Sequence, residues 1–191
     1  MSLDRYISEV YNNNPYWFHE ETQLAHHISR ISKVLNNKVY LNGRHSILEK
    51  EDIKYKEKEL VTAKTILQTA KSIIKFHNSY IMGKRTSIIG SDEMIKHYNN
   101  VFRHGKFNLT NYKIVDTLNC YGDCYEYVYY NGSKITSKLI ASEDGYPIYD
   151  DEGNYVGFIE HWTDAISNIS YYYIYSDNKV DKITNRGGKY L

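Results

Sequence analysis

Three strand-like runs separated by glycine-containing turns constrain the fold of this chain more than any other feature. They lie within residues 121–162, and each is rich in tyrosine, valine or isoleucine. β-Branched and aromatic runs bounded by such turns are typical of antiparallel hairpins. The sequence therefore predicts an antiparallel β-meander in the second half of the chain. Its strands are expected at residues 125–130, 135–140 and 155–162, with turns at Asn131-Gly132, Asp144-Gly145 and Glu152-Gly153.

The first half of the chain has the periodicity of amphipathic helices. Within residues 17–37, apolar side chains recur at steps of four, three and four, which predicts a helix that begins after Pro15 and ends near Asn36-Asn37. A longer apolar stripe in residues 63–81 predicts a second helix, which Gly83 ends. The apolar face of the first helix would consist of Leu24, Ile28, Ile31 and Leu35, and that of the second of Ala63, Ile66, Leu67, Ala70, Ile73, Ile74 and Ile81.

Two further helices are expected before the meander. Ser91 is a suitable N-cap for a helix that ends at Gly105, and another should run from about Leu109 to Leu118. Between the first two helices, Asn42-Gly43 predicts a small surface turn or hairpin, and the charged residues 49–59 indicate a solvated linker or the start of a helix. Helices followed by strands predict an α+β fold in which the helices pack on one face of the meander.

The last strand-like segment, residues 171–175, does not alternate between apolar and polar side chains. Such a strand should be covered on both faces, by its own helices on one side and by something else, such as a neighbouring subunit, on the other. Residues 180–183 are expected to pair with it, and residues 187–191 form a weakly structured end. We expect one α+β domain over residues 24–191, preceded by an N-terminal arm, residues 1–23.

The charge balance excludes several classes of function. Lysine and arginine total 24 against 23 acidic residues, so the net charge is +1 and offers no long-range attraction for nucleic acid or anionic lipid. The start of the chain has no signal-like apolar region, and no run is long enough to cross a bilayer. A soluble intracellular product with no membrane partner is expected. The 21 tyrosines suit half-buried sheets and subunit interfaces.

The candidate reactive residues form no recognisable catalytic or metal-binding motif. Cys120 and Cys124 have unsuitable spacing for a disulfide and no second Cys/His pair for zinc, so two buried free thiols are expected. Of His19, His26 and His27, the last two should point about 100 degrees apart on a helix and lie on its surface, which disfavours a shared ion.

The remaining polar motifs have simpler structural interpretations. Residues 150–154 (DDEGN) lack the pattern of a calcium loop and predict an acidic turn. Residues 83–86 (GKRT) follow a helix instead of a strand, which excludes a phosphate-binding loop. Asp123, Glu126 and Glu160 would support an enzyme only if a deep pocket held at least two of them. No catalytic, cofactor-binding or metal-binding residue is therefore predicted, and no cofactor or enzymatic activity is expected.

Five short segments, in this order, resemble the portal proteins of tailed bacteriophages, in the family found in siphophages of Gram-positive hosts. The family has an aromatic, glycine, histidine and Ile-Leu stretch, a helix that ends in Leu-Gly-Lys-Pro, a Gly-x-x-Tyr strand and a following strand pair. In this chain, Arg85 occupies the position where the family usually has the proline of the Leu-Gly-Lys-Pro motif. Family members also commonly have an arginine near the position of Glu160. The segments are 40–48 (YLNGRHSIL), 78–84 (NSYIMGK), 121–129 (YGDCYEYVY), 148–151 (IYDD) and 157–162 (GFIEHW).

The resemblance covers roughly residues 24–186 and implies the N-terminal part of a portal wing domain, without the stem, clip, tunnel loop and crown of longer relatives. Portals form rings of roughly twelve subunits with cyclic symmetry. They occupy one capsid vertex, contact terminase, capsid or scaffold and the head-to-tail adaptor, and pass double-stranded DNA only through the assembled channel. The implied location is the virion, and the host cytoplasm during assembly. We expect a truncated phage or prophage product with weak or no ring assembly.

A second class of function remains open on the residues alone. A soluble module could use its tyrosine-rich sheet to stack on glycan rings or on bases of single-stranded nucleic acid. Burial of most of these tyrosines under helices would argue against such a module, and an exposed aromatic row would support it. The residues that decide are Tyr125, Tyr127, Tyr129 and Tyr171 to Tyr173.

Overall fold

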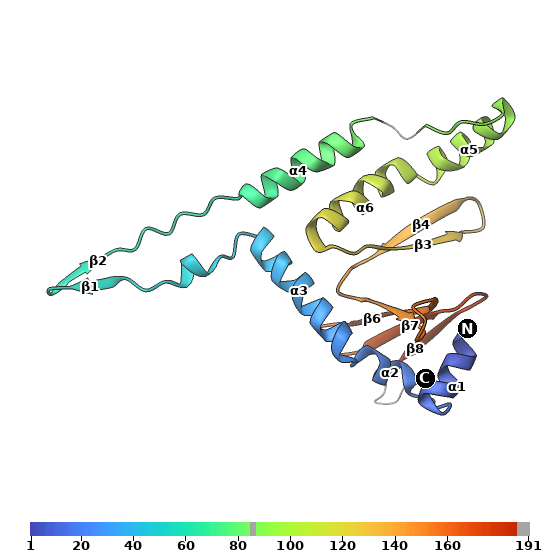
Figure 1. Cartoon of the computed structure of the whole chain (residues 1–191), viewed down its shortest axis with the longest axis horizontal. Coiled ribbons are helices and arrows are strands. Elements are labelled where there is room, and N and C mark those ends of the chain that lie inside the picture. Colours follow the sequence, from blue (N-terminus) through green and yellow to red (C-terminus); the bar gives the residue numbers. More distant parts are fainter. Residues whose placement is uncertain (85–86, 187–191) are drawn as a thin grey trace. The chain divides into compact units, whose positions relative to one another are not determined.

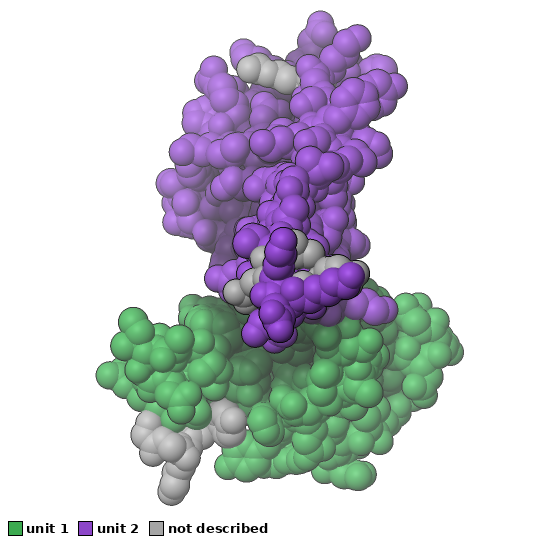
Figure 2. Space-filling model, turned by 90° about the vertical axis from the view of Figure 1, so that its left-hand side faces the viewer, with its two compact units in different colours: residues 1–32, 140–191 green, residues 33–139 purple. Residues whose placement is uncertain are grey.

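The computed structural model describes residues 1–84 and 87–186, which form two compact units of an α+β fold (Figures 1 and 2). Unit 1 contains residues 1–32 and 140–191, and unit 2 contains residues 33–139. The predicted α+β class is confirmed, whereas the domain boundary at residue 23 stays a prediction. The predicted weak structure of residues 187–191, and the part of the GKRT segment at positions 85 and 86, lie outside the described residues.

Unit 1 is a four-stranded antiparallel sheet with helices from the start of the chain (Figure 1). The strands follow one another in the sheet in sequence order, as a meander does. The elements are α1 (Leu3–Tyr11), α2 (Trp17–Thr22), the first part of α3 (Ala25–Leu41), β5 (Gly145–Tyr149), β6 (Tyr155–Thr163), β7 (Ser170–Tyr175) and β8 (Val180–Thr184).

Side chains from α1, α2 and one face of this sheet form the core of unit 1. Helices α1 and α2 both contact β6, and a Cβ atom added to Gly157 of β6 would lie only 3.2 Å from Leu3 Cδ1. A side chain at position 157 would therefore fit only if Leu3 shifted by a few tenths of an ångström. The cluster consists of Leu3, Tyr6, Trp17, Phe18, Tyr146, Ile148, Val156, Ile159, Tyr172 and Ile174.

Helices cover one face of strand β7, as predicted, and the cover expected on its other face stays a prediction. Tyr172 and Ile174 are buried on the helix-covered face, whereas Tyr171 and Tyr173 point to the opposite face and are half-buried. Tyrosine occupies both faces because its ring is apolar and its hydroxyl tolerates water. Buried and half-buried side chains therefore alternate along β7, although the residue types do not. The predicted hairpin with β8 is confirmed.

Unit 2 holds the remaining helices and two separate two-stranded sheets. Strands β1 and β2 form one hairpin, and β3 and β4 form the other. The elements are the rest of α3, the 3₁₀ helix η1 (Ser46–Glu49), β1 (Ile53–Tyr55), β2 (Lys58–Leu60), α4 (Thr69–Met82), α5 (Asp92–His104), α6 (Phe107–Tyr121), β3 (Tyr125–Tyr130) and β4 (Ile135–Ile140).

The expected single meander is wrong, because the chain changes sheet after β4. The bounds of β3 and β4 are as predicted, but β5 to β8 belong to another sheet. A turn separates the two sheets, in which the Asp144 N–H donates to the Ala141 carbonyl at 2.9 Å. Arg30 of α3 fixes this turn, since its guanidinium donates to the carbonyl of Ser142 at 2.7 Å and to that of Gly145.

Helix α3 differs from its prediction in both its end and its buried face. It continues past Asn36-Asn37 to Leu41, where the N–H groups of Gly43 and Arg44 donate to the carbonyls of Tyr40 and Val39. With Gly43 at φ +81°, this is a Schellman motif, a glycine-dependent helix end that lies beyond the predicted one. The predicted Asn42-Gly43 turn exists, but no hairpin surrounds it.

The apolar stripe predicted for α3 is also displaced. Ile28 and Leu35 are 52% and 45% exposed, whereas His27 and Val34, seven residues apart, are each 1% exposed. Residues at this spacing share a helix face, so the buried face is the adjacent one. The prediction failed because a buried histidine does not contribute to a hydrophobic pattern.

Helix α4 starts at Thr69, six residues later than its apolar stripe suggested, and ends as predicted before Gly83. Its most buried side chain is polar. Asn78 donates to Asp116 Oδ1 at 2.5 Å and accepts from Asn119 Nδ2 at 2.8 Å, both on α6. These bonds connect α4 to α6. The predicted bounds of α5 are confirmed, with Ser91 and Gly105 at its ends, and α6 extends the predicted Leu109–Leu118 helix at both ends.

The charged segment 49–59 forms the β1–β2 hairpin, so the prediction of a linker or helix start is corrected. Lys56 and Glu57 at its turn have φ values of +47° and +61°. Two consecutive positive values are the geometry of a type I′ hairpin turn, which usually selects asparagine and glycine. The absence of those residues explains why the sequence did not predict this turn. Among residues 1–84 and 87–186, no helix has both the length and the apolar character needed to cross a membrane.

Candidate functional site

The three acids considered as catalytic candidates are divided between the two units. Asp123 and Glu126 belong to unit 2, and Glu160 belongs to unit 1. Tyr125 donates to Asp123 Oδ2 at 3.0 Å, and Tyr175 donates to the buried Glu160 at 2.7 Å. These bonds to neighbouring tyrosines indicate structural roles for the two carboxylates.

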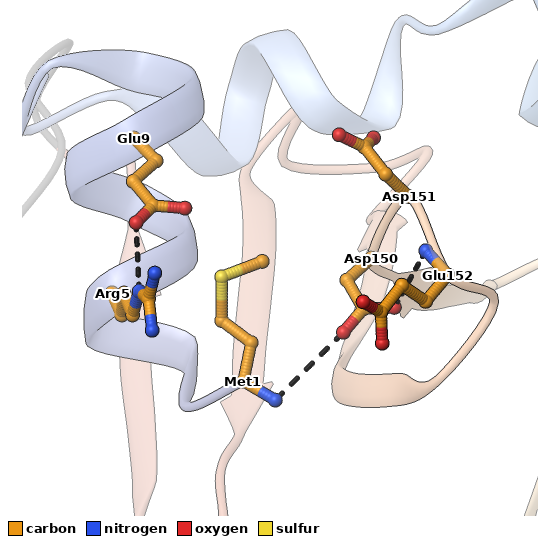
Figure 3. Close-up of a pocket in the computed structure, with 6 residues that line it drawn as sticks. All are labelled: Met1, Arg5, Glu9, Asp150, Asp151 and Glu152. Atoms are coloured by element: carbon orange, nitrogen blue, oxygen red, sulfur yellow. Dashed lines mark hydrogen bonds and ion pairs between the residues drawn. The ribbon is translucent and has the colours of Figure 1, made fainter.

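The acidic segment 150–154 forms the turn predicted for it and lines a shallow pocket (Figure 3). The Gly153 N–H donates to the Asp150 carbonyl at 2.9 Å, and Asp150 Oδ1 accepts the N–H groups of Asn154 and Glu152 at 2.9 and 3.1 Å. The bond from the Asn154 backbone is the main reason that the pKa of Asp150 lies below its usual value. The Asp150 carboxylate therefore stabilises its own turn.

Residues from α1 complete the wall of this pocket (Figure 3). Arg5 Nε donates to Glu9 Oε1 at 2.7 Å, and the Met1 amino nitrogen lies 3.7 Å from Asp150 Oδ2. Charges of both signs thus face one another in pairs. The Arg5–Glu9 pair is exposed and contributes little to stability, and neither pair defines a ligand.

Cys120 and Cys124 are free thiols, as predicted, but they are half-buried instead of fully buried. Burial is the main cause that raises the pKa of both thiols, with smaller contributions from Asp116 near Cys120 and Glu126 near Cys124. A raised pKa leaves less thiolate at neutral pH, and the thiolate is the reactive form. The pair is therefore a poor nucleophile.

We expect iodoacetamide to modify these cysteines several-fold more slowly in the folded chain than in urea at pH 7.5. The rate should rise as the pH passes 9, because the raised pKa delays thiolate formation. Mass spectrometry of timed samples measures both rates. Equal rates for folded and unfolded chain would contradict the inferred environment.

Aromatic side chains form a row on the face of the unit 1 sheet opposite its core. The Trp162 ring is stacked on Tyr171, with centroids 5.2 Å apart and planes 15° apart, and meets Tyr173 edge-on at 5.0 Å. Lys182 Nζ lies 4.9 Å from the Tyr173 ring centroid. The three aromatic residues are half-buried, so this face combines a flat apolar surface with a cation at its side.

Strand β3 carries a second aromatic group in unit 2. The rings of Tyr127 and Tyr129 are stacked, with centroids 5.4 Å apart and planes 12° apart. Tyr129 and Tyr130 are exposed, and Tyr125 and Tyr127 are half-buried. Of the six tyrosines chosen to decide between packing and binding, only Tyr172 is buried. The majority are not buried under helices, and the aromatic row is partly accessible.

The most connected polar cluster in unit 1 centres on Glu21 of α2, which is 2% exposed. Tyr6 and Tyr11 of α1 donate to Glu21 Oε2 at 3.0 and 2.6 Å. His27 Nε2 of α3 lies 3.4 Å from Glu21 Oε1. One carboxylate thus connects three helices. Sequence reasoning missed Glu21, because its partners lie at unrelated spacings on separate helices.

The electrostatics of the cluster favour an ionised Glu21. Burial by itself would raise the pKa of Glu21, but hydrogen bonds from His27, Tyr11 and Tyr6 outweigh it and hold the pKa below its usual value. Burial is the main cause that raises the pKa of both tyrosines. The next cause is the charge of Glu21 for Tyr6 and the hydrogen bond to Glu21 for Tyr11. The hydroxyls therefore remain protonated donors, and the carboxylate remains an acceptor.

The neighbouring histidines are arranged differently from their prediction. His27 is buried, which corrects the expectation of a surface position, whereas His26 is exposed as expected. Their ring centroids lie only 4.0 Å apart, so the two side chains bend toward each other instead of diverging. Burial is the main cause that lowers the pKa of His26. His19 is exposed and lies apart from this pair, with Nδ1 3.2 Å from the Tyr172 hydroxyl.

Comparison with known proteins identifies the family. The model of one family, "Phage portal protein, SPP1 Gp6-like", matches residues 20–190. No curated protein matches the chain. The family match includes the end of α2, all of α3 to α6 and every strand, and so spans both compact units. The resemblance seen in the short motifs is thereby confirmed. This chain belongs to the SPP1 Gp6-like family of phage portal proteins.

Proposed function

We propose that this chain is a structural component of a portal ring at one capsid vertex, through which phage DNA is packaged and ejected. The family match over residues 20–190 carries this proposal. Within that ring, we assign the chain to a wing-like outer region. Its partners would be copies of itself, terminase, capsid or scaffold proteins and the head-to-tail adaptor, and its location would be the virion and, during assembly, the host cytoplasm.

Exposed apolar side chains in unit 2 support a role in an assembly. Helix α4 exposes a stripe at helical spacing, with Ile73, Phe76 and Tyr80 at 54%, 69% and 82% exposure. Its opposite face, which includes Asn78, contacts α6. Apolar surface of this kind is typical of protein interfaces and unusual on isolated monomers. We assign this stripe to contacts with another protein of the portal assembly.

The charge of the chain supports an indirect relationship with DNA. A net charge of +1 provides few phosphate contacts, and phosphate contacts dominate the affinity of proteins for DNA. We therefore propose that DNA passes through the assembled ring without tight binding by this chain. The family match supports a structural role in place of a catalytic one.

The proposal is tested in particles of the phage or prophage that encodes the chain. A peptide tag in the exposed turn at Gly132 is detected by gold-labelled antibody in purified virions, with the same tag on a major capsid protein as the control. We expect label at a single vertex for this chain and over the whole shell for the capsid protein. Purified virions without this chain, or with label at many vertices, would contradict the proposal.

A glycan- or base-binding module is a second candidate, favoured by the stacked and accessible Tyr127–Tyr129 pair. Stacking on such rings would change the fluorescence of the aromatic residues. Titration with oligosaccharides and with oligothymidylate, with Tyr129→Ala as the control variant, tests it. Saturable binding that Tyr129→Ala abolishes would favour the module, and the absence of binding would exclude it for these ligands.

A further inference from the structure

Three side chains with metal-ligating atoms meet at the α2–α3 junction of unit 1. One ligand atom from each of Glu21, His26 and His27 lies within 4.8 Å of the other two. Glu21 and His27 are buried, and His26 is exposed. We propose that these three residues bind a divalent transition metal ion of the zinc class. This site is independent of the portal function proposed above.

The separation between Glu21 and His27 suits two ligands of one ion. Glu21 Oε1 and His27 Nε2 lie 3.4 Å apart, which is longer than an ordinary charge-assisted hydrogen bond. Two atoms that each lie about 2.0–2.1 Å from a tetrahedral zinc ion are about 3.3 Å apart. This edge of the site therefore already has the size that coordination requires.

Hydrogen bonds already orient Glu21 as a ligand through one oxygen. Tyr6 and Tyr11 both donate to Oε2, at 3.0 and 2.6 Å, and leave Oε1 directed toward His27. Ligating carboxylates are commonly fixed in this way by partners outside the coordination shell. The two tyrosines would thus position the carboxylate without contacting the ion.

The His27 ring has one nitrogen without a hydrogen-bond partner in the described part of the chain. Its Nδ1 atom is buried and has no hydrogen-bond partner among residues 1–84 and 87–186. A buried polar atom without a partner is unusual and calls for an explanation such as a bound ion or water. The nitrogen that faces Glu21 is Nε2, so an ion held between Nε2 and Oε1 would leave Nδ1 for a bound water. The proposal therefore rests on the geometry of the three ligating side chains.

The exposed side of the cluster supplies an entrance and an adjustable ligand. His26 is the second residue of α3. Its side chain is exposed, whereas that of His27 is buried. A small rotation would bring its ring nitrogen to bonding distance, and water would occupy the fourth position on the solvent side. Three protein ligands with one open position are a common zinc arrangement.

The donor set selects the type of ion. Two imidazole nitrogens and one carboxylate oxygen suit Zn²⁺, Co²⁺ or Ni²⁺, whereas Mg²⁺ and Ca²⁺ prefer shells made entirely of oxygen. We therefore expect one zinc-class ion per chain and no measurable binding of Mg²⁺ or Ca²⁺ at the same concentrations.

The test uses the full chain after removal of metal with EDTA. Isothermal titration with ZnCl₂ measures affinity and stoichiometry, and the absorption of CoCl₂-loaded protein reports tetrahedral coordination. His26→Ala should weaken zinc binding at least about tenfold, because it removes one of three ligands. It should leave the circular dichroism spectrum unchanged, because His26 is exposed. His97→Ala, which removes an exposed histidine from α5, should change neither property.

Two results would overturn the proposal. One is the absence of stoichiometric zinc binding by the unmodified chain. The other is equal zinc affinity in His26→Ala, His97→Ala and the unmodified chain, which would assign the binding to scattered histidines, since the chain has eight. A tenfold or larger loss confined to His26→Ala, together with intense tetrahedral cobalt absorption that the same variant loses, supports it.

Discussion

Replacing Phe18 with alanine should lower the free energy of unfolding of unit 1 by about 3–5 kcal/mol, the usual cost of removing a buried phenylalanine. Phe18 is 1% exposed, and its ring centroid lies 4.9 Å from that of Tyr172 on β7. The substitution leaves a cavity between α2 and the sheet. The neighbouring rings of Trp17 and Tyr172 cannot fill it without a movement of the helix.

The measurement can be confined to unit 1. Both tryptophans of the chain, Trp17 and Trp162, belong to that unit, so tryptophan fluorescence during urea denaturation follows its unfolding. Ile166→Ala is the matched control, because Ile166 is 98% exposed and its removal should change the free energy by less than about 0.5 kcal/mol.

The same experiment decides whether residues 1–23 are a separate arm or part of the unit 1 core. An N-terminal arm over residues 1–23, as the sequence suggested, would tolerate Phe18→Ala at little cost. If residues 1–23 belong to the unit 1 core, Phe18→Ala should cause the full predicted loss of unfolding free energy. A cost below about 1 kcal/mol would therefore contradict the packing of α2 on the sheet and support the arm.

The elements that could be predicted from the sequence are those whose signals are local. Strands β3 and β4 have the predicted bounds because an Asn-Gly turn and β-branched runs define them within a few residues. Helix α5 has the predicted bounds because Ser91 and Gly105 mark its two ends. Local signals of this kind do not depend on which other segment the element contacts.

The errors arose where distant contacts decide the structure. The division of the strands into two sheets depends on the turn at Ala141–Asp144, which Arg30 holds from 112 residues away. The face that α3 buries depends on His27, a residue that no hydrophobic pattern includes. The resemblance to portals succeeded because it used the order of several motifs along the chain instead of the contacts between them.

The candidate metal cluster could not be predicted from the sequence either. The adjacent histidines were visible in the sequence, but a uniform helix would direct them apart. In the structure, α2 ends at Thr22 and α3 begins at Ala25, so the two histidines lie in the first turn of a new helix, directly after the segment that carries Glu21. The break between the helices, which the prediction of one helix beginning after Pro15 missed, separates the segment of Glu21 from that of the two histidines.

Replacing Glu21 with alanine should destabilise metal-free unit 1 by about 3 kcal/mol or more. The variant removes the acceptor of Tyr6, Tyr11 and His27, and each buried donor left unpaired costs about 1–3 kcal/mol. Tyr11 is less buried than the other two and should contribute the least. Urea denaturation in EDTA, followed by tryptophan fluorescence, measures the loss without any contribution from bound ions.

Two further variants separate this network from a general effect of removing a glutamate. Glu9→Ala breaks only the exposed pair with Arg5 and should cost at most about 1 kcal/mol. In the Glu21→Ala background, Tyr6→Phe should recover part of the loss, because it removes a hydroxyl that has lost its carboxylate acceptor, whereas in the unmodified chain the same change should destabilise. If Tyr6→Phe has the same effect in both backgrounds, the Tyr6–Glu21 hydrogen bond does not contribute to the stability of unit 1, which would contradict this prediction.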